Sequence, residues 1–205
     1  MCGRRLQGNK MRLKITLLAA ALAMSGCSIR HEVVNDYPQY LINNQGNSHL
    51  PTTSAASKYM IMPATQAHHY EFRSAMAGYA NVWVVEFGRL LDDTMQSHDV
   101  QAAFGKLVKV QGSDASGGVL VFDLQNYTYA DMGAHIILKV TYRRDGRDVF
   151  SKVYQADGQT QGGKMFWGGG FAMKNAVQQS TKLALDHILV QLINDLNAAS
   201  PSSSH

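Results

Sequence analysis

Apolar and polar residues alternate along the second half of the chain. Three such stretches follow one another, at 119–129, 135–143 and 148–156. In the first, Leu120, Phe122 and Leu124 share one face, as in a strand that buries one side. Asp145-Gly146 separates the last two stretches and favours a two-residue turn with positive φ at both positions. The pattern therefore predicts an antiparallel β-meander.

A helical period replaces this alternation in two other places. Apolar residues recur at helical spacing over 82–97, starting with Trp83, and again over 171–197. The apolar stripe of the second helix consists of Val177, Ala184, Leu185, Ile188, Leu192 and Leu196. Gln178 and Lys182 fall on its polar side, where we expect them to face solvent.

Short apolar runs predict further strands, at 59–62, 70–72 and 107–110. The order of these elements predicts an α+β domain over residues 58–199. We expect an antiparallel β-meander of about four to five strands, with two helices packed on one of its faces.

Residues 27–57 and 200–205 flank this predicted domain. Both are rich in Asn, Gly, Pro, Ser or Thr and lack a sustained period. We therefore predict a flexible tether at 27–57 and a disordered tail at 200–205. For the first segment a packed irregular arm is the alternative, because Tyr37 and Leu41 could dock on the domain.

The net charge of +4 over 205 residues comes from the N-terminus. Residues 1–26 hold five basic residues and no acidic ones, followed within the segment by the apolar run 15–24. This is the pattern of a secretory signal peptide, with Met11 as an alternative start. The run is shorter than the roughly 20 residues that cross a bilayer. Without residues 1–26 the chain keeps 14 basic and 15 acidic residues, which argues against a nucleic-acid partner.

The end of the predicted signal, Met24-Ser25-Gly26-Cys27, resembles the lipobox of bacterial lipoproteins. The first position departs from the commonest residue of that motif, Leu. The resemblance implies cleavage after Gly26 and membrane attachment through acylated Cys27. Ser28 at the next position implies the outer membrane, with the domain facing the periplasm. An ordinary signal peptide with a nearby cysteine is the alternative.

The element order, the Asp145-Gly146 hairpin and the Ala176-Val177-x-x-Ser180 rhythm resemble YajG-like lipoproteins. They also resemble the PqiC-like auxiliary lipoproteins of envelope ABC transport systems. The resemblance implies a non-enzymatic accessory protein that assists an envelope transport or assembly complex. A periplasmic lipoprotein that binds lipid or a small ligand between sheet and helices is the alternative, and an envelope hydrolase is a third.

Two aromatic pairs are candidate contact residues. Phe166 and Trp167 lie between glycine clusters ahead of the last helix, and adjacent aromatic residues in such a loop favour a partner or ligand contact. A plain strand-to-helix connection is the alternative. Tyr127 and Tyr129 share a strand face with polar Gln125, so they form either a half-wet outer face or a contact face.

Catalytic and metal-binding motifs are missing from the sequence. None of the eight histidines is spaced as His-x-His or His-x-x-x-His, and neither Gly-x-Ser-x-Gly nor a Walker motif occurs. Cys2 lies in the predicted signal, so the mature chain would keep no free thiol. We therefore expect no catalytic residue, no metal and no cofactor.

Overall fold

The computed structural model describes residues 28–75, 78–112, 116–159 and 169–199. Strands and helices mix along the chain and form two sheets, which confirms the α+β class. In chain order the elements are β1 (Ile29–Glu32), α2 (Tyr37–Asn43), β2 (Lys58–Ile61), α3 (Pro63–Gln66), β3 (His69–Phe72), β4 (Asn81–Glu86), α4 (Phe87–Gln96), α5 (His98–Phe104), β5 (Val108–Lys109), β6 (Gly118–Ala130), β7 (Gly133–Arg144), β8 (Arg147–Gln159) and α6 (Gly169–Ala199).

The larger sheet has the strand order β5-β2-β6-β7-β8. Its antiparallel part, β6-β7-β8, is the predicted meander. At the β7–β8 turn, Asp145 and Gly146 have φ of 50° and 77°, as the sequence predicted. On the other side of β6, β2 pairs parallel with both β6 and β5. The sheet is therefore a local meander extended by two short strands from earlier in the chain.

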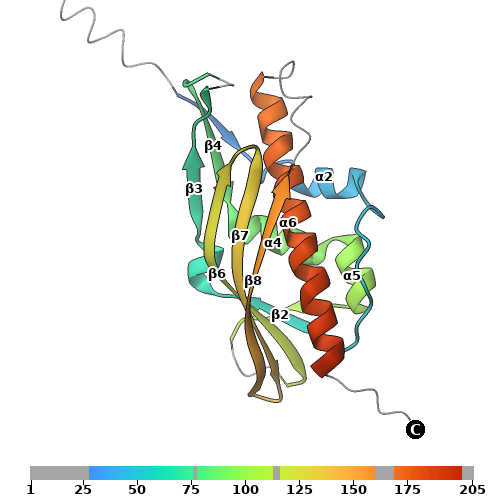
Figure 1. Cartoon of the computed structure of the whole chain (residues 1–205). Coiled ribbons are helices and arrows are strands. Elements are labelled where there is room, and N and C mark those ends of the chain that lie inside the picture. Colours follow the sequence, from blue (N-terminus) through green and yellow to red (C-terminus); the bar gives the residue numbers. More distant parts are fainter. Residues whose placement is uncertain (1–27, 76–77, 113–115, 160–168, 200–205) are drawn as a thin grey trace, which may run out of the picture.

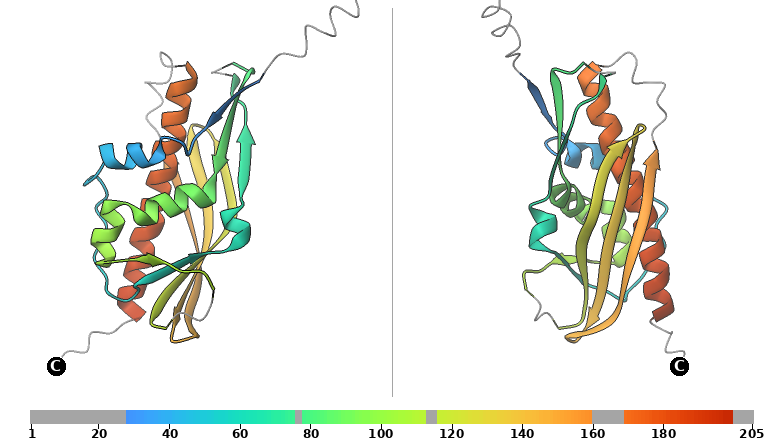
Figure 2. Two further views of the ribbon diagram at one scale, coloured as in Figure 1. Left: turned by 180° about the vertical axis from the view of Figure 1, so that it is seen from behind. Right: turned by 60° about the vertical axis from the view of Figure 1, so that its left-hand side comes forward.

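Helices cover one face of this sheet. Figure 2 shows α2, α4 and α6 in front of the strands in one view and behind them in the other. The long helix α6 packs along β7 and β8. Every residue of its predicted apolar stripe is buried, together with the inward side chains of β6 and β7, of which Phe122, Ile136 and Val140 are examples. The hydrophobic core lies between this sheet face and the helices.

The smaller sheet, β1-β4-β3, corrects the prediction of a helix over 82–97. Residues 82–85 form a strand, and the helix starts only at Phe87. Val82, Trp83, Val84 and Val85 are all buried, so both faces of β4 are covered, and β1 and β3 pair with its two edges. Three β-branched residues and an aromatic one suit a buried strand better than a helix.

The segment 28–57, predicted as a flexible tether, is instead packed on the domain as far as the structure describes it. β1 is a parallel strand of the smaller sheet, and Val33 and Val34 are buried behind it. Further along, the Thr53 N–H donates to the Ala103 carbonyl at 2.8 Å, and the Tyr142 hydroxyl donates to the Ala55 carbonyl at 2.6 Å. We call residues 28–57 the N-terminal arm. The alternative of a packed arm was the better interpretation.

Figure 1 shows the resulting shape, an elongated domain with β1 and the start of α6 at one end. The β7–β8 hairpin and the end of α6 lie at the other end. Among the described residues, no helix is long and apolar enough to cross a membrane.

Candidate functional site

Of the site residues singled out from the sequence, Tyr127 and Tyr129 lie in the described part of the chain. Gly26, Cys27, Phe166 and Trp167 lie outside the described residues. Tyr127 and Tyr129 are 2% and 8% exposed, so the prediction of a contact face at these tyrosines is wrong.

A β-bulge in β6 explains why the two tyrosines point inward. The register of β6 against β7 shifts between Leu124 and Asn126. An extra residue in a strand reverses which side chains face the core, because side chains alternate with a period of two. Leu120 and Phe122 face inward at even positions before the bulge, and the tyrosines face inward at odd positions after it.

Tyr127 belongs to a continuous group of aromatic rings that joins the two sheets. Its ring lies 5.5 Å from the rings of Tyr70 and Phe87, and its hydroxyl forms a 2.9 Å hydrogen bond with Thr181 of α6. Tyr129 stacks on Phe72 at 4.9 Å. Burial raises the pKa of the Tyr127 hydroxyl above its ordinary range. These tyrosines therefore hold the core together.

The N-terminal arm covers part of the polar side of α6, which corrects a second expectation. Gln178 and Lys182 are buried rather than solvated. The Gln178 side chain donates to the Val33 carbonyl at 2.7 Å. Lys182 binds both oxygens of Asp186 at 2.6 Å and also contacts the Ser48 hydroxyl.

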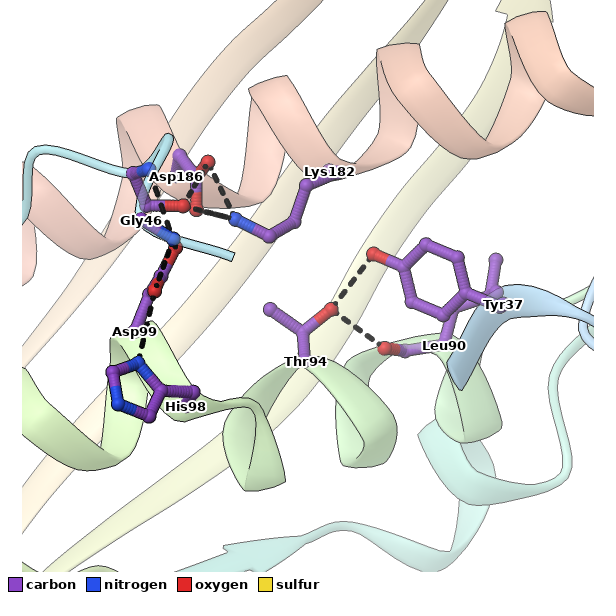
Figure 3. A network of polar contacts seen from close by, with 9 residues as sticks. Tyr37, Gly46, Leu90, Thr94, His98, Asp99, Lys182 and Asp186 are labelled. Atoms are coloured by element: carbon purple, nitrogen blue, oxygen red, sulfur yellow. Dashed lines mark hydrogen bonds and ion pairs between the residues drawn. The ribbon is translucent and has the colours of Figure 1, made fainter. Parts of the chain in front are cut away.

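Figure 3 shows how these contacts continue into α4 and α5. One carboxylate, Asp99, accepts hydrogen bonds from the Gly46 and Ser48 backbone N–H groups. Burial raises the pKa of Asp99, but these hydrogen bonds and that from His98 outweigh it, so the pKa is lowered overall. The arm is thus fastened to two helices by a charged group on each.

A second contact joins the N-terminal arm to α4. The Thr94 hydroxyl donates to the Leu90 carbonyl at 2.8 Å, which uses its single hydrogen. Tyr37, at the start of α2, therefore donates to the Thr94 oxygen at 2.9 Å. Both side chains are fully buried, so α2 is held in one orientation (Figure 3).

Ser48 beside Lys182 has the composition of a serine–lysine nucleophilic pair. Such a pair requires a neutral amine that can take the serine proton. Lys182 instead forms a two-oxygen ion pair with Asp186, and Ser48 donates to the same carboxylate at 3.0 Å. An ion-paired ammonium has no free electron pair to accept a proton. The arrangement is that of a structural contact.

Two surface grooves flank α2. The first has a volume of about 480 Å³ and runs between α2 and α6. It is lined by Asp36, Gln39, Tyr40, Asn43, Asn44, Asn175, Gln178 and Gln179. Six of these eight side chains are amides, and each amide offers both donors and an acceptor. We call this the amide groove.

The second groove is smaller, about 240 Å³, and lies between α2 and the junction of α4 and α5. Pro38, Leu41 and Ile42 form its apolar part, and Ile42 is exposed. Asp93 lines the opposite side, where burial raises the pKa of its carboxyl. Neither groove lies between the sheet and the helices, where the alternative of a ligand-binding lipoprotein places its pocket.

In the described part of the chain, several histidines contact aromatic or acidic side chains and form no metal-binding cluster. Within it, no group of three or more His, Cys, Asp or Glu residues could hold a metal ion. His31 stacks on Trp83 at 5.6 Å, and His68 packs edge-on against Phe87 at 6.2 Å. Burial lowers the pKa of His68, and a 2.8 Å hydrogen bond to Asp157 raises that of His135.

Three exposed hydrophobic side chains lie at the end of the domain where β1 begins. They are Ile29 at the start of β1, Tyr79 just before β4, and Phe171 in the first turn of α6, with exposed fractions of 55%, 71% and 73%. The Ile29 N–H donates to the Ala80 carbonyl at 2.9 Å, which holds the first two side by side. Figures 1 and 2 place the start of α6 at the same end. We call these three residues the apolar tip.

Comparison with known proteins adds a general likeness. No family model matches the chain, and the search of curated proteins returned no match. Among solved structures, protein XCC0632 from Xanthomonas campestris, of the family DUF330, is similar at 15% identity and a TM-score of 0.44, over 74% of this chain and 88% of that one. The hypothetical protein CT253 from Chlamydia trachomatis is similar at 8% identity and a TM-score of 0.38, over 72% of this chain and all of that one.

Proposed function

We propose that this chain is a lipid-anchored accessory protein of the bacterial envelope. In this proposal acylated Cys27 holds it in the outer membrane, facing the periplasm. It would assist an envelope transport or assembly complex through protein or lipid contacts and without catalysis. The observation that carries the proposal is the Met24-Ser25-Gly26-Cys27 motif, which directly precedes a folded domain.

The position of β1 supports a close attachment. Only Ser28 stands between Cys27 and the first strand. Two residues of extended chain span about 7 Å, so an acylated Cys27 would hold the domain against the bilayer. Two or three acyl chains on one cysteine make such attachment stable, because each buried methylene contributes about 0.8 kcal/mol.

The anchor is tested by changing the cysteine. In the full-length protein expressed in a bacterium, Cys27→Ala should move the chain from the membrane pellet to the soluble fraction and abolish incorporation of labelled palmitate. Cys2→Ala is the matched control, because Cys2 lies in the predicted signal peptide and should change neither result. Membrane pelleting of the Cys27→Ala variant, with no label on the unchanged protein, would contradict the proposal.

A second candidate function is binding of a polar ligand in the amide groove. Amide side chains match the hydroxyl and acetamido groups of envelope glycans, which need both donors and acceptors. Asn175 and Gln179 line the groove and are exposed, so they are free of the core.

Calorimetric titration with soluble peptidoglycan fragments tests this candidate. Asn175→Ala combined with Gln179→Ala should weaken binding severalfold. Gln191→Ala removes an exposed amide from the same helix outside the groove and should leave binding unchanged. Equal binding by all three proteins would exclude the groove as the ligand site.

A further inference from the structure

We propose that the apolar tip, Ile29, Tyr79 and Phe171, rests in the headgroup region of the bilayer that carries the anchor and so gives the domain a fixed orientation. This inference rests on the proposed attachment through Cys27 and adds a second point of contact with the membrane. The tip contacts lipid in this proposal and not a second protein.

The most exposed hydrophobic side chains lie at one end of the domain. Tyr79 and Phe171 are the most exposed large hydrophobic residues in the described part of the chain. They come from distant segments of the sequence, yet the start of β4 and the start of α6 both lie at the end where β1 starts (Figures 1 and 2). Large aromatic side chains are rarely left in water without a reason, and exposed groups of them indicate contact sites.

Ile29 of the tip lies close to the anchor along the chain. Ile29 lies about 7 Å or less from Cys27, because the two are only two residues apart. The polar headgroup layer on each side of a bilayer is about 5–8 Å thick. An acylated cysteine is held at this layer by its chains, so Ile29 would lie within or directly above it.

The three side chains of the tip suit the headgroup region chemically. Tyr has an apolar ring with a polar hydroxyl, and aromatic residues of this kind concentrate at the boundary between headgroups and acyl chains. Phe and Ile add apolar area without charge. The Lys174 ammonium lies 6.0 Å from the Phe171 ring, and its charge is already paired with Asp36.

The charged side chains near the tip bond mostly within the protein, and the Arg73 guanidinium donates to the Tyr79 carbonyl. Arg30 is ion-paired to Glu71, and Lys174 to Asp36. Contact with the membrane should therefore depend on apolar area more than on lipid charge. The orientation should be similar on zwitterionic and on anionic membranes.

Depth-dependent quenching tests the proposal in the acylated full-length lipoprotein. Tyr79→Cys and Phe171→Cys variants would each be labelled with an environment-sensitive dye and reconstituted in phosphatidylcholine vesicles that contain a nitroxide-labelled lipid. Val149→Cys is the matched control, an exposed apolar site beside the β7–β8 hairpin at the opposite end. Acylation is verified first by the mass of the N-terminal peptide, and folding by circular dichroism.

We expect quenching several times stronger at positions 79 and 171 than at 149, and little change when phosphatidylglycerol is added. An acylated protein with equal quenching at all three positions would overturn the fixed orientation and leave the anchor intact. An unacylated protein would overturn the proposed function and this inference together. If only one of the two labelled variants folds, its comparison with position 149 still decides.

Discussion

The β6-β7-β8 meander and the β1–β4 pair join chain segments at very different separations. In the larger sheet, β6, β7 and β8 follow one another through tight turns and pair antiparallel over 12 or 13 residues each. In the smaller sheet, β1 pairs parallel with β4, so that Ile29 lies beside Asn81 and Glu32 beside Val84. A hairpin turn brings its strands together locally, whereas a parallel pair needs a long crossover.

This difference explains which sheet was visible in the sequence. In β6 and β7, apolar side chains recur at every second position on one face, and Asp145-Gly146 marks the turn between β7 and β8, so the meander could be interpreted from local residues. All four central positions of β4 are apolar and buried, so both faces of this strand are covered and the alternation disappears. A short apolar run of this kind does not distinguish a strand from a buried helix.

The largest effect that we predict comes from the smaller sheet. Trp83 is fully buried and stacks between His31 and Phe72, each at 5.6 Å. Trp83→Ala should lower the free energy of unfolding by about 3–5 kcal/mol, because truncating a buried aromatic residue leaves a cavity. For a chain of this size that corresponds to a Tm lower by roughly 10 °C in calorimetry.

Val153→Ala on the outer face of β8 is the control for Trp83→Ala. Val153 is exposed, so its truncation should change stability by no more than about 0.5 kcal/mol. If Trp83→Ala had an equally small effect, the smaller sheet would not be part of the cooperative fold.

An intermediate effect is expected where the larger sheet meets α6. A Cβ atom on Gly158 would lie 1.7 Å from the Ser180 carbonyl oxygen and 3.0 Å from the Ala184 nitrogen. Gly158→Ala should therefore push α6 away from β8 and destabilise the protein by about 1–3 kcal/mol, as overpacked cores do. Denaturant unfolding measures this change.

Gln155→Ala is the matched control for Gly158→Ala, because Gln155 lies on the same strand and is exposed. It should be close to neutral. Equal stability of the two variants would mean that α6 lies farther from the end of β8 than the structure places it.

The smallest effect is a pH dependence within the meander. His135 on β7 forms an ion pair with Asp157 on β8, and this hydrogen bond raises the His135 pKa above its ordinary value. The stabilisation is therefore fully present below about pH 6.5, the ordinary value for histidine, and is lost as the pH rises through the raised folded-state pKa. Both groups are substantially exposed, so the effect should be slight.

Unfolding curves at several pH values measure this contribution. His135→Asn should flatten the dependence on pH in the window just above the ordinary histidine pKa. An identical pH profile in the variant would show that the pair contributes nothing to stability.

The candidate contact residues show the same division between local and distant information. The alternation around Tyr127 predicts a strand correctly, but the bulge after Leu124 reverses the face on which the tyrosine lies. No residue at the bulge is a glycine or proline that would have marked it in the sequence. A single added residue was enough to turn a predicted contact surface into core.

Three features could be predicted from the sequence because each depends on residues close together in the chain. They are the β-meander, the apolar stripe of α6 and the lipobox resemblance at Cys27. The packing of the N-terminal arm on the domain depends on residues far away in the sequence. Its polar composition resembles a tether, yet Gln178 and Lys182 of α6 supply the hydrogen bonds that its backbone and Ser48 need. The apolar tip is likewise a product of the fold. Ile29, Tyr79 and Phe171 are unremarkable one by one, and they become a surface only when a parallel strand pair and a long helix end at the same place.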